Sequence, residues 1–206
     1  MQYIIARDRP KNLQTQELSC SVIVPCFNES DNIERCIARI PRMGKSTEIV
    51  VVDDGSSDGT SDIVNNITKK NSDVLLVKHS LNQGKASAIK TGFEHARGDI
   101  VIILDADMAV PPEELPKFFY AIASGNAEFV NGTRMVYPME KDAMRFFNFL
   151  GNKMFGMILS LLVGQRNTDT LCGTKAILRK YYKYININSH WGDFDLLFGT
   201  AKLKLK

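Results

Sequence analysis

Two aspartates at the end of an apolar run are the residues best placed to do chemistry. Ile100 to Leu104 is continuously apolar, and Asp105 and Asp107 follow it. A run with no polar face predicts a central strand of a parallel sheet covered on both sides. Ligands bind such sheets at the carboxyl ends of the strands, where two carboxylates can hold a hard divalent cation together with a diphosphate. Alternatively, the pair caps the turn before a helix that opens at 111–114.

Polar loops follow two further apolar runs, and they would share this edge of the sheet. Residues 21–24 precede Phe27, and residues 48–52 precede Asp53 and Asp54. Phe27 could lie against a base, and either aspartate could accept from a base N–H group or hold ribose hydroxyls. Together with a cation on the first aspartate pair, these groups predict a nucleotide-sugar site.

The elements that must position these loops alternate between strand and helix. Strands are expected at 21–24, 48–52, 74–77 and 100–104. Helices are expected between them, with apolar residues at helical spacing: Ile33, Cys36, Ile37 and Ile40, then Ile63, Val64 and Ile67, then Ala86, Ile89, Phe93 and Ala96. Pro25 is expected to end the first strand, and Ser30 or Asp31 to cap the helix after it. The alternation predicts an α/β fold with a doubly wound, mostly parallel sheet flanked by helices.

The second part of the chain is less regular. We expect a helix at 112–124, a short strand at 128–130, and polar loops at 131–134 and 169–175. Residues 143–163 are apolar around a thin polar stripe at helical spacing, which predicts an amphipathic helical segment on a membrane surface or in the core. Residues 196–206 are expected to be helical and then strand-like. Their abrupt stop suggests that the chain is truncated at its C-terminus.

Composition and charge narrow the class of protein. The 206 residues, 44% of them hydrophobic, predict a lead-in segment (1–19) and one domain (20–206). A net charge of +3 argues against a nucleic-acid partner. The four cysteines lack C-x-x-C spacing, so we interpret them as reduced thiols that fill the core. The sequence shows neither a signal peptide nor a membrane span, which favours a cytoplasmic location.

Several nucleotide-binding classes lack their motifs in this sequence. Asn82-Gln83-Gly84-Lys85 has no first glycine of a phosphate loop, which argues against a P-loop NTPase. No G-x-G-x-x-G follows the first strand, and residues 25–29 contain no glycine, so a nicotinamide dehydrogenase and a nucleotidyltransferase are also disfavoured. His79, His95 and His190 lack metal-ligand spacing, and we interpret them as structural or surface residues.

Four motifs together resemble a known family. They are Pro25-Cys26-Phe27-Asn28-Glu29, Asp53-Asp54-Gly55-Ser56-Ser57-Asp58-Gly59-Thr60, Asn82-Gln83-Gly84-Lys85 and Asp105-Ala106-Asp107. In this order they resemble the family 2 inverting glycosyltransferases of GT-A fold. Gly132-Thr133-Arg134, the apolar segment after it, and residues 169–175 and 191–197 are most similar to dolichyl- and polyprenyl-phosphate glucosyl- and mannosyltransferases. The resemblance covers the chain from about Ser21 to its end.

The resemblance implies transfer of a hexose, with inversion, from a UDP- or GDP-sugar to a polyprenyl or dolichyl phosphate, assisted by Mg²⁺ or Mn²⁺. It implies nucleotide-sugar contacts for Pro25, Phe27, Glu29, Val52, Asp53, Asp54, Gly84, Lys85 and Ala106. It implies catalytic roles for Asp105, Asp107 and Arg134, and metal binding by Asp105 and Asp107. It implies contact of Lys175 with the acceptor phosphate and of Arg134 with the acceptor or donor phosphate. Peripheral membrane contact through residues 143–163 would place the protein at the inner face of a membrane.

Two positions depart from the family pattern. Phe27 stands where tyrosine is usual, which keeps the ring. Ala109 stands where the mannosyltransferases present a glutamine to the metal, which removes one ligand.

The acceptor decides the role of Asp193 and Asp195. A phosphate acceptor is already anionic at pH 7 and needs no strong general base, whereas a hydroxyl acceptor would need one of these aspartates to remove its proton. They could instead support Lys175 or Arg134. Two other functions remain open: transfer to a hydroxyl acceptor in cell-surface polysaccharide synthesis, and a non-catalytic nucleotide-sugar-binding domain.

Overall fold

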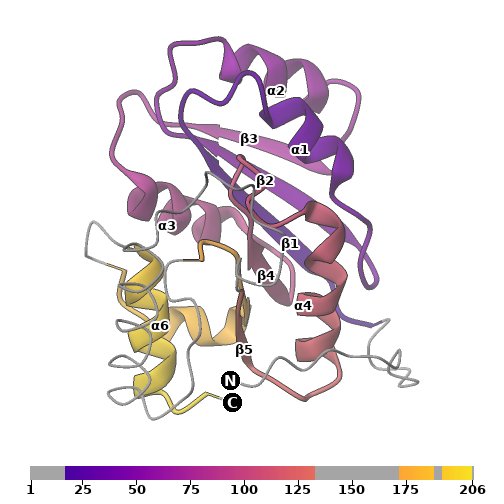
Figure 1. Ribbon diagram of the computed structural model, residues 1–206, viewed down its shortest axis with the longest axis vertical. Coiled ribbons are helices and arrows are strands. Elements are labelled where there is room, and N and C mark those ends of the chain that lie inside the picture. The colour runs from indigo at the N-terminus through magenta and orange to yellow at the C-terminus, as the bar shows by residue number, and fades with distance from the viewer. Residues whose placement is uncertain (1–16, 133–171, 188–191, 206) are drawn as a thin grey trace, which may run out of the picture.

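A computed structural model describes residues 17–132, 172–187 and 192–205. These residues form one six-stranded sheet with the strand order β3-β2-β1-β4-β6-β5. Helices cover both faces of the sheet (Figure 1). The α/β class and the doubly wound, mostly parallel sheet predicted from the sequence are therefore confirmed.

Four parallel strands form one side of the sheet, with β3 at its edge: β1 (Cys20–Cys26), β2 (Thr47–Asp53), β3 (Val74–Lys78) and β4 (Ile100–Ile103). Every residue of β1 and of β4 is buried. Strands covered on both faces need apolar side chains at every position rather than at alternate ones, and this requirement explains the unbroken apolar runs in the sequence.

The sequence analysis predicted the last two strands of the sheet less accurately. β5 (Phe129–Asn131) lies at the edge, and β6 (Lys175–Leu178) is inserted antiparallel between β4 and β5. The sequence analysis assigned Lys175 to a loop and predicted no strand at 175–178, which is wrong. A strand of four residues that follows a polar stretch gives too short a pattern to be recognised.

The helices divide into two layers. α1 (Ile33–Arg39), α2 (Thr60–Thr68) and α4 (Leu115–Ala123) pack on one face of the sheet, with Val22 and Val24 of β1. α3 (Lys85–His95) and α6 (Gly192–Lys202) pack on the other face, with Ile23. Successive residues of β1 thus serve opposite core clusters, as the two-residue repeat of a strand requires.

Several predicted boundaries are wrong by a few residues. Pro25 lies inside β1, where it is tolerated because β4 pairs with β1 only as far as Ile23. α1 is capped by Asn32, without a side-chain hydrogen bond, rather than by Ser30 or Asp31.

The helix expected at 112–124 is a short 3-10 turn, η2 (Pro112–Glu114), followed by α4. α6 begins at Gly192, before the predicted start, and residues 203–205 after it are not in a strand. The predicted segment 143–163 lies outside the described residues. None of the helices within the described ranges is long and apolar enough to cross a membrane.

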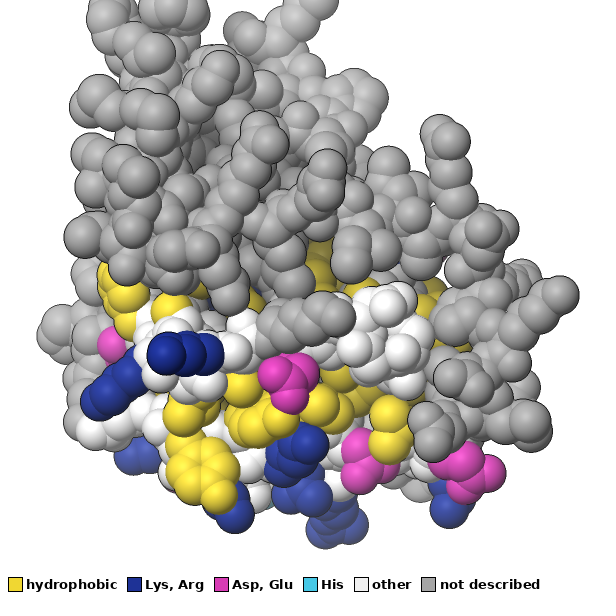
Figure 2. Space-filling view, turned by 90° about the horizontal axis from the view of Figure 1, so that it is seen from below, with side chains coloured by type: hydrophobic (Ala, Val, Ile, Leu, Met, Phe, Trp, Pro, Cys, Tyr) yellow, Lys and Arg dark blue, Asp and Glu magenta, His cyan; other side chains and the backbone are white. Residues whose placement is uncertain are grey.

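The 3-10 helix η3 (Arg179–Tyr184) interleaves basic and aromatic residues. Its Tyr182 ring stacks on Phe93 of α3 with the ring centroids 4.0 Å apart, and its Tyr181 hydroxyl donates to the carboxylate of Glu128. Figure 2 views the lower side of the molecule, where Lys and Arg side chains lie among apolar ones. Tyr181 and Tyr182 of η3 therefore pack against the core cluster between the sheet, α3 and α6.

Candidate active site

A cleft lies at the carboxyl ends of β1, β2 and β4. Its volume is about 350 Å³. Its lining includes nine of the predicted site residues: Pro25, Phe27, Glu29, Asp54, Gly84, Lys85, Asp105, Ala106 and Asp107. The sequence analysis did not assign three other lining residues to the site: Cys26, Asn82 and Ala88. These loops converge because the carboxyl ends of neighbouring parallel strands meet at one edge of the sheet.

The two aspartates at the end of β2 have different environments. Asp53 is fully buried, and its carboxylate accepts hydrogen bonds from Ser56 N (3.0 Å) and the Ser61 hydroxyl. Val52 is also fully buried, and neither residue lines the cleft. The side chains of Val52 and Asp53 are thus used inside the fold, and their contact with the nucleotide stays a prediction. Asp54 is the aspartate that faces the cleft.

The acidic loop after β2 holds the loop after β1 in place. Three successive backbone N–H groups of that first loop donate to it: Asn28 N to Ser56 Oγ (2.8 Å), Glu29 N to Thr60 Oγ1 (2.9 Å) and Ser30 N to Asp58 Oδ2 (3.0 Å). Asn28 adopts a left-handed conformation, with φ of 55°. The Phe27 ring, 46% exposed, is thereby fixed at the rim of the cleft, where a base could stack on it.

Asp58 makes the hydrogen bonding between these two loops sensitive to pH. The Thr60 hydroxyl, together with the Ser30 and Thr60 N–H groups, holds the pKa of the Asp58 carboxyl well below its usual range. A depressed folded-state pKa means that the stabilisation is present above the unfolded pKa of about 4 and is lost as the pH falls below it.

We expect Asp58→Asn to lower the thermal midpoint by about 2 to 4 °C at pH 7, since one charge-assisted contact near the surface is lost. The difference between variant and wild type should shrink as the pH approaches 3. Thermal unfolding followed by circular dichroism at several pH values measures this. Asp62→Asn, in the exposed first turn of α2, controls for the loss of one charge. A difference that stays constant between pH 3 and 7 would contradict the pH dependence.

Asp105 is held from two sides. Lys85 Nζ, at the start of α3, lies 2.7 Å from Asp105 Oδ1, and the two side chains are 41% and 25% exposed. On the other side lies Gly173, where an added Cβ would stand 1.9 Å from Asp105 Oδ2. The carboxylate has room only because residue 173 has no side chain. Sequence offers no signal for this contact, since 68 positions separate the two residues.

Asp107 occupies the turn that follows β4. Its Oδ1 accepts a hydrogen bond from Ala109 N (2.9 Å), and Met108 between them is left-handed, with φ of 56°. β4 ends at Ile103, so both aspartates lie in the loop after the strand. The turn directs the pair toward the cleft.

The composition of the cleft suits a divalent cation. Of the described residues that line it, four carry carboxylates (Glu29, Asp54, Asp105 and Asp107) and one, Lys85, carries an ammonium group. In the described part of the chain, no group of three or more His, Cys, Asp or Glu side chains is arranged to hold a metal. Two carboxylates completed by diphosphate oxygens and water are a common Mg²⁺ site, so Asp105 and Asp107 fit such an ion.

The four cysteines behave as core residues. All are buried, and none of the four forms a disulfide. Burial raises the pKa of the Cys36 thiol to about 12, and it raises the pKa of the Cys26 thiol, in the cleft wall, even further. Because thiols with raised pKa values stay protonated and unreactive, the interpretation of these residues as fillers agrees with their environment.

The remaining predicted site residues are less accessible or lie elsewhere. Lys175 is 1% exposed, and its ammonium group donates to the carbonyl of Cys172; its contact with an acceptor phosphate stays a prediction. Asp193 and Asp195 lie in the first turn of α6, whose Gly192 abuts Ala86 of α3, one residue from Lys85. Arg134 lies outside the described residues, and its role stays a prediction.

His79 is a residue that the sequence analysis set aside as structural or surface. It is buried, and its ring contacts Asp54 and Thr91. His95, by contrast, is exposed on α3. The spacing of the histidines gave no hint of this difference, because the partners of His79 are distant in sequence.

Comparison with known proteins identifies the family. The model of "Glycosyl transferase family 2" matches residues 21–185. An undecaprenyl-phosphate 4-deoxy-4-formamido-L-arabinose transferase of Pectobacterium carotovorum subsp. carotovorum (strain PC1) is 36% identical over 173 residues, which are 80% of this chain and 49% of that protein. A dolichol-phosphate mannosyltransferase of Mycosarcoma maydis is 37% identical over 134 residues, which are 60% of this chain and 45% of that protein. The chain thus spans about half the length of these relatives.

Solved structures show the same fold. Glucosyl-3-phosphoglycerate synthase of M. tuberculosis superposes with a TM-score of 0.71 at 22% identity, covering 92% of this chain and 69% of that chain. A mannosyltransferase from Pyrobaculum calidifontis, solved with GDP-Man and Mn²⁺, gives a TM-score of 0.56 at 24% identity, covering 89% of this chain and 52% of that chain. The predicted GT-A fold is therefore confirmed. With the family match extending over most of the 206 residues, the chain belongs to glycosyl transferase family 2.

Proposed function

We propose that this chain carries the donor site of an enzyme that transfers a hexose, with inversion, from a UDP- or GDP-sugar to a polyprenyl phosphate. The observation that carries the proposal is the cleft, which joins an exposed aromatic ring, Phe27, to the carboxylates of Asp105 and Asp107. An aromatic surface suits a base, and a cation site suits a diphosphate. A nucleoside diphosphate needs both within one cleft.

The residues would divide the donor between them. The base would stack on Phe27 beside Pro25, with Asp54 and Glu29 as hydrogen-bond acceptors on the same wall. Gly84, Lys85 and Ala106 would lie along the ribose and diphosphate. Lys85 is the cation among the described cleft residues, so it would contact diphosphate oxygens when its pairing with Asp105 is exchanged.

A divalent cation is part of the proposal. Asp105 and Asp107 would hold Mg²⁺ or Mn²⁺, which when bound neutralises charge on the leaving diphosphate. The carboxylates of the cleft would otherwise repel the donor's phosphates, because like charges at short range raise the free energy of binding.

The names of the relatives support a polyprenyl-phosphate acceptor. The Pectobacterium protein is named as an undecaprenyl-phosphate transferase and the Mycosarcoma protein as a dolichol-phosphate transferase. A phosphate oxygen is already ionised at pH 7, so it could attack without a strong general base, and Arg134 would bind it. Residues 143–163 would contact the membrane that carries such a lipid, at its inner face.

Glycosyl release from a panel of UDP- and GDP-sugars, with and without polyprenyl phosphate, tests the proposal. We expect product only with one nucleotide sugar, a divalent cation and the lipid phosphate. Transfer to an oligosaccharide instead of the lipid would favour the hydroxyl-acceptor alternative, in which Asp193 or Asp195 acts as base. Nucleotide-sugar binding without any transfer would favour the non-catalytic alternative and contradict the proposal.

A further inference from the structure

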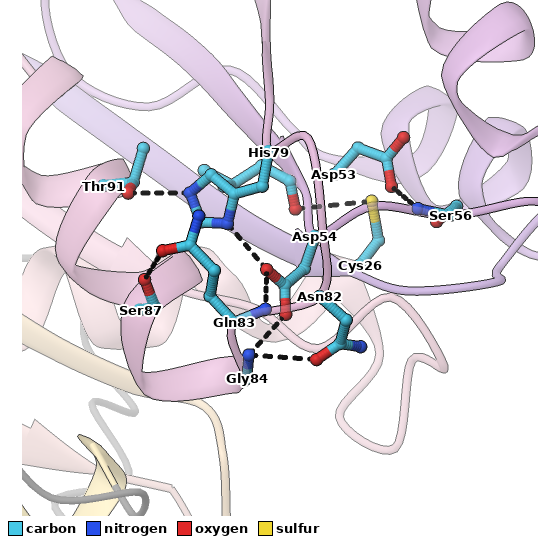
Figure 3. Close-up of polar contacts among 11 residues, drawn as sticks. Cys26, Asp53, Asp54, Ser56, His79, Asn82, Gln83, Gly84, Ser87 and Thr91 are labelled. Atoms are coloured by element: carbon cyan, nitrogen blue, oxygen red, sulfur yellow. Dashed lines mark hydrogen bonds and ion pairs between the residues drawn. The ribbon is translucent and has the colours of Figure 1, made fainter.

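We infer that His79 is a positioning residue for the nucleotide donor: it fixes the carboxylate of Asp54 and, through it, the turn 82–84 that forms one wall of the cleft. The inference rests on the proposed function for its ligand. His79 directly follows β3, is 8% exposed, and is anchored by a hydrogen bond from its backbone N to Asp53 O (2.9 Å). Figure 3 shows its ring between Asp54 and Thr91.

Asp54 is the centre of this network. His79 Nδ1 lies 2.6 Å from its Oδ1, Gln83 N donates to the same oxygen at 3.0 Å, and Gly84 N donates to Oδ2 at 2.7 Å. The residue is 3% exposed, so its charge receives little help from water. A buried carboxylate requires such donors, because an unpaired charge away from water is costly.

The Asp54 carboxylate sets which nitrogen of the imidazole carries the proton. Nε2 lies 2.9 Å from Thr91 Oγ1 on α3. A carboxylate can only accept, so Nδ1 donates to Asp54, and in the neutral ring the Thr91 hydroxyl donates to Nε2. The imidazole therefore connects three elements that the chain reaches separately: the end of β2, the end of β3, and α3.

The turn that Asp54 holds reaches the other end of the cleft. Asn82 and Gly84 line the cleft, Gly84 caps α3, and Lys85 next to it pairs with Asp105. Fixing Asp54 therefore fixes the start of α3, and with it the ammonium group beside the proposed metal site. If His79 no longer donated, Asp54 would lose one of its three donors, and the carboxylate could swing away from the turn.

Two amide substitutions separate this role from general packing. In asparagine the amide nitrogen lies near the position of the histidine Nδ1, and in glutamine it lies near Nε2. His79→Asn should therefore keep the hydrogen bond to Asp54, whereas His79→Gln should keep only the one to Thr91. Calorimetric titration with UDP and GDP measures donor affinity, and thermal unfolding measures stability. We expect about 10-fold weaker nucleotide binding for His79→Gln and less than about 3-fold for His79→Asn.

Hydrogen exchange tests, without any ligand, whether the hydrogen bond from His79 to Asp54 holds the turn 82–84. The Gly84 amide, followed by NMR, should lose protection in His79→Gln and keep it in His79→Asn. Thr91→Val should give a smaller loss in the same direction, with Thr91→Ser as its control.

Two outcomes would overturn the role of His79: equal losses of affinity in both amide variants, or unchanged protection of Gly84 in His79→Gln. If the wild type binds neither UDP nor GDP, the proposed function fails, whereas the exchange measurement still decides whether His79 holds the turn.

Discussion

Asp107→Asn is expected to lower the transfer rate roughly a thousand-fold and to leave the thermal midpoint close to that of the wild type. A cation on the leaving diphosphate contributes several kcal/mol of charge stabilisation in the transition state, and each ~1.4 kcal/mol is a factor of ten in rate. The side chain is exposed in the turn after β4, so its replacement by an isosteric amide leaves the core untouched. Turnover of the preferred nucleotide sugar and Mn²⁺ binding by electron paramagnetic resonance measure the two effects.

Asp105→Asn should cause a comparable loss of activity, but it should also break an ion pair inside the cleft. It also removes the charge that pairs with Lys85, so this ion pair is lost as the metal ligand is weakened. Asp62→Asn, in the exposed first turn of α2, is the matched control and should retain activity. Full activity of both cleft variants in excess EDTA would exclude the metal role of the aspartate pair.

Gly173→Ala is expected to weaken Mn²⁺ binding and lower turnover by about 10-fold or more. The new Cβ would stand 1.9 Å from Oδ2 and 2.6 Å from Cγ of Asp105, closer than real side-chain atoms approach. Either the carboxylate rotates away from its position or the backbone at 173 shifts. Since overpacking of this kind costs ~1 to 3 kcal/mol, stability should fall as well.

A substitution at a second glycine separates the effect of Gly173→Ala on metal binding from its effect on stability. Gly199→Ala in α6 would place a Cβ 2.6 Å from Ile185 Cγ2, in the core and away from the cleft lining. Both variants should lower the thermal midpoint, but only Gly173→Ala should weaken the binding of Mn²⁺. Equal metal affinity in the two variants would show that Gly173 does not position Asp105.

The sequence by itself determined the parallel part of the sheet and the place of the cleft. Apolar runs that alternate with helices indicate parallel strands, and a parallel sheet brings the loops after those strands to one edge. For this reason Phe27, Asp105 and Asp107 could be assigned to one site from the sequence, and the family resemblance added Glu29. Their side chains line the same cleft in the structure.

Only the tertiary structure decided how these residues are used. Sequence could not distinguish Asp53 from Asp54, because the last residue of β2 and the distant partners of each carboxylate had to be known. The pairing of Lys85 with Asp105, the space left by Gly173 and the hydrogen bond from His79 to Asp54 join residues at least 20 positions apart. Local periodicity carries no information about such contacts, since packing between separate elements alone brings them together.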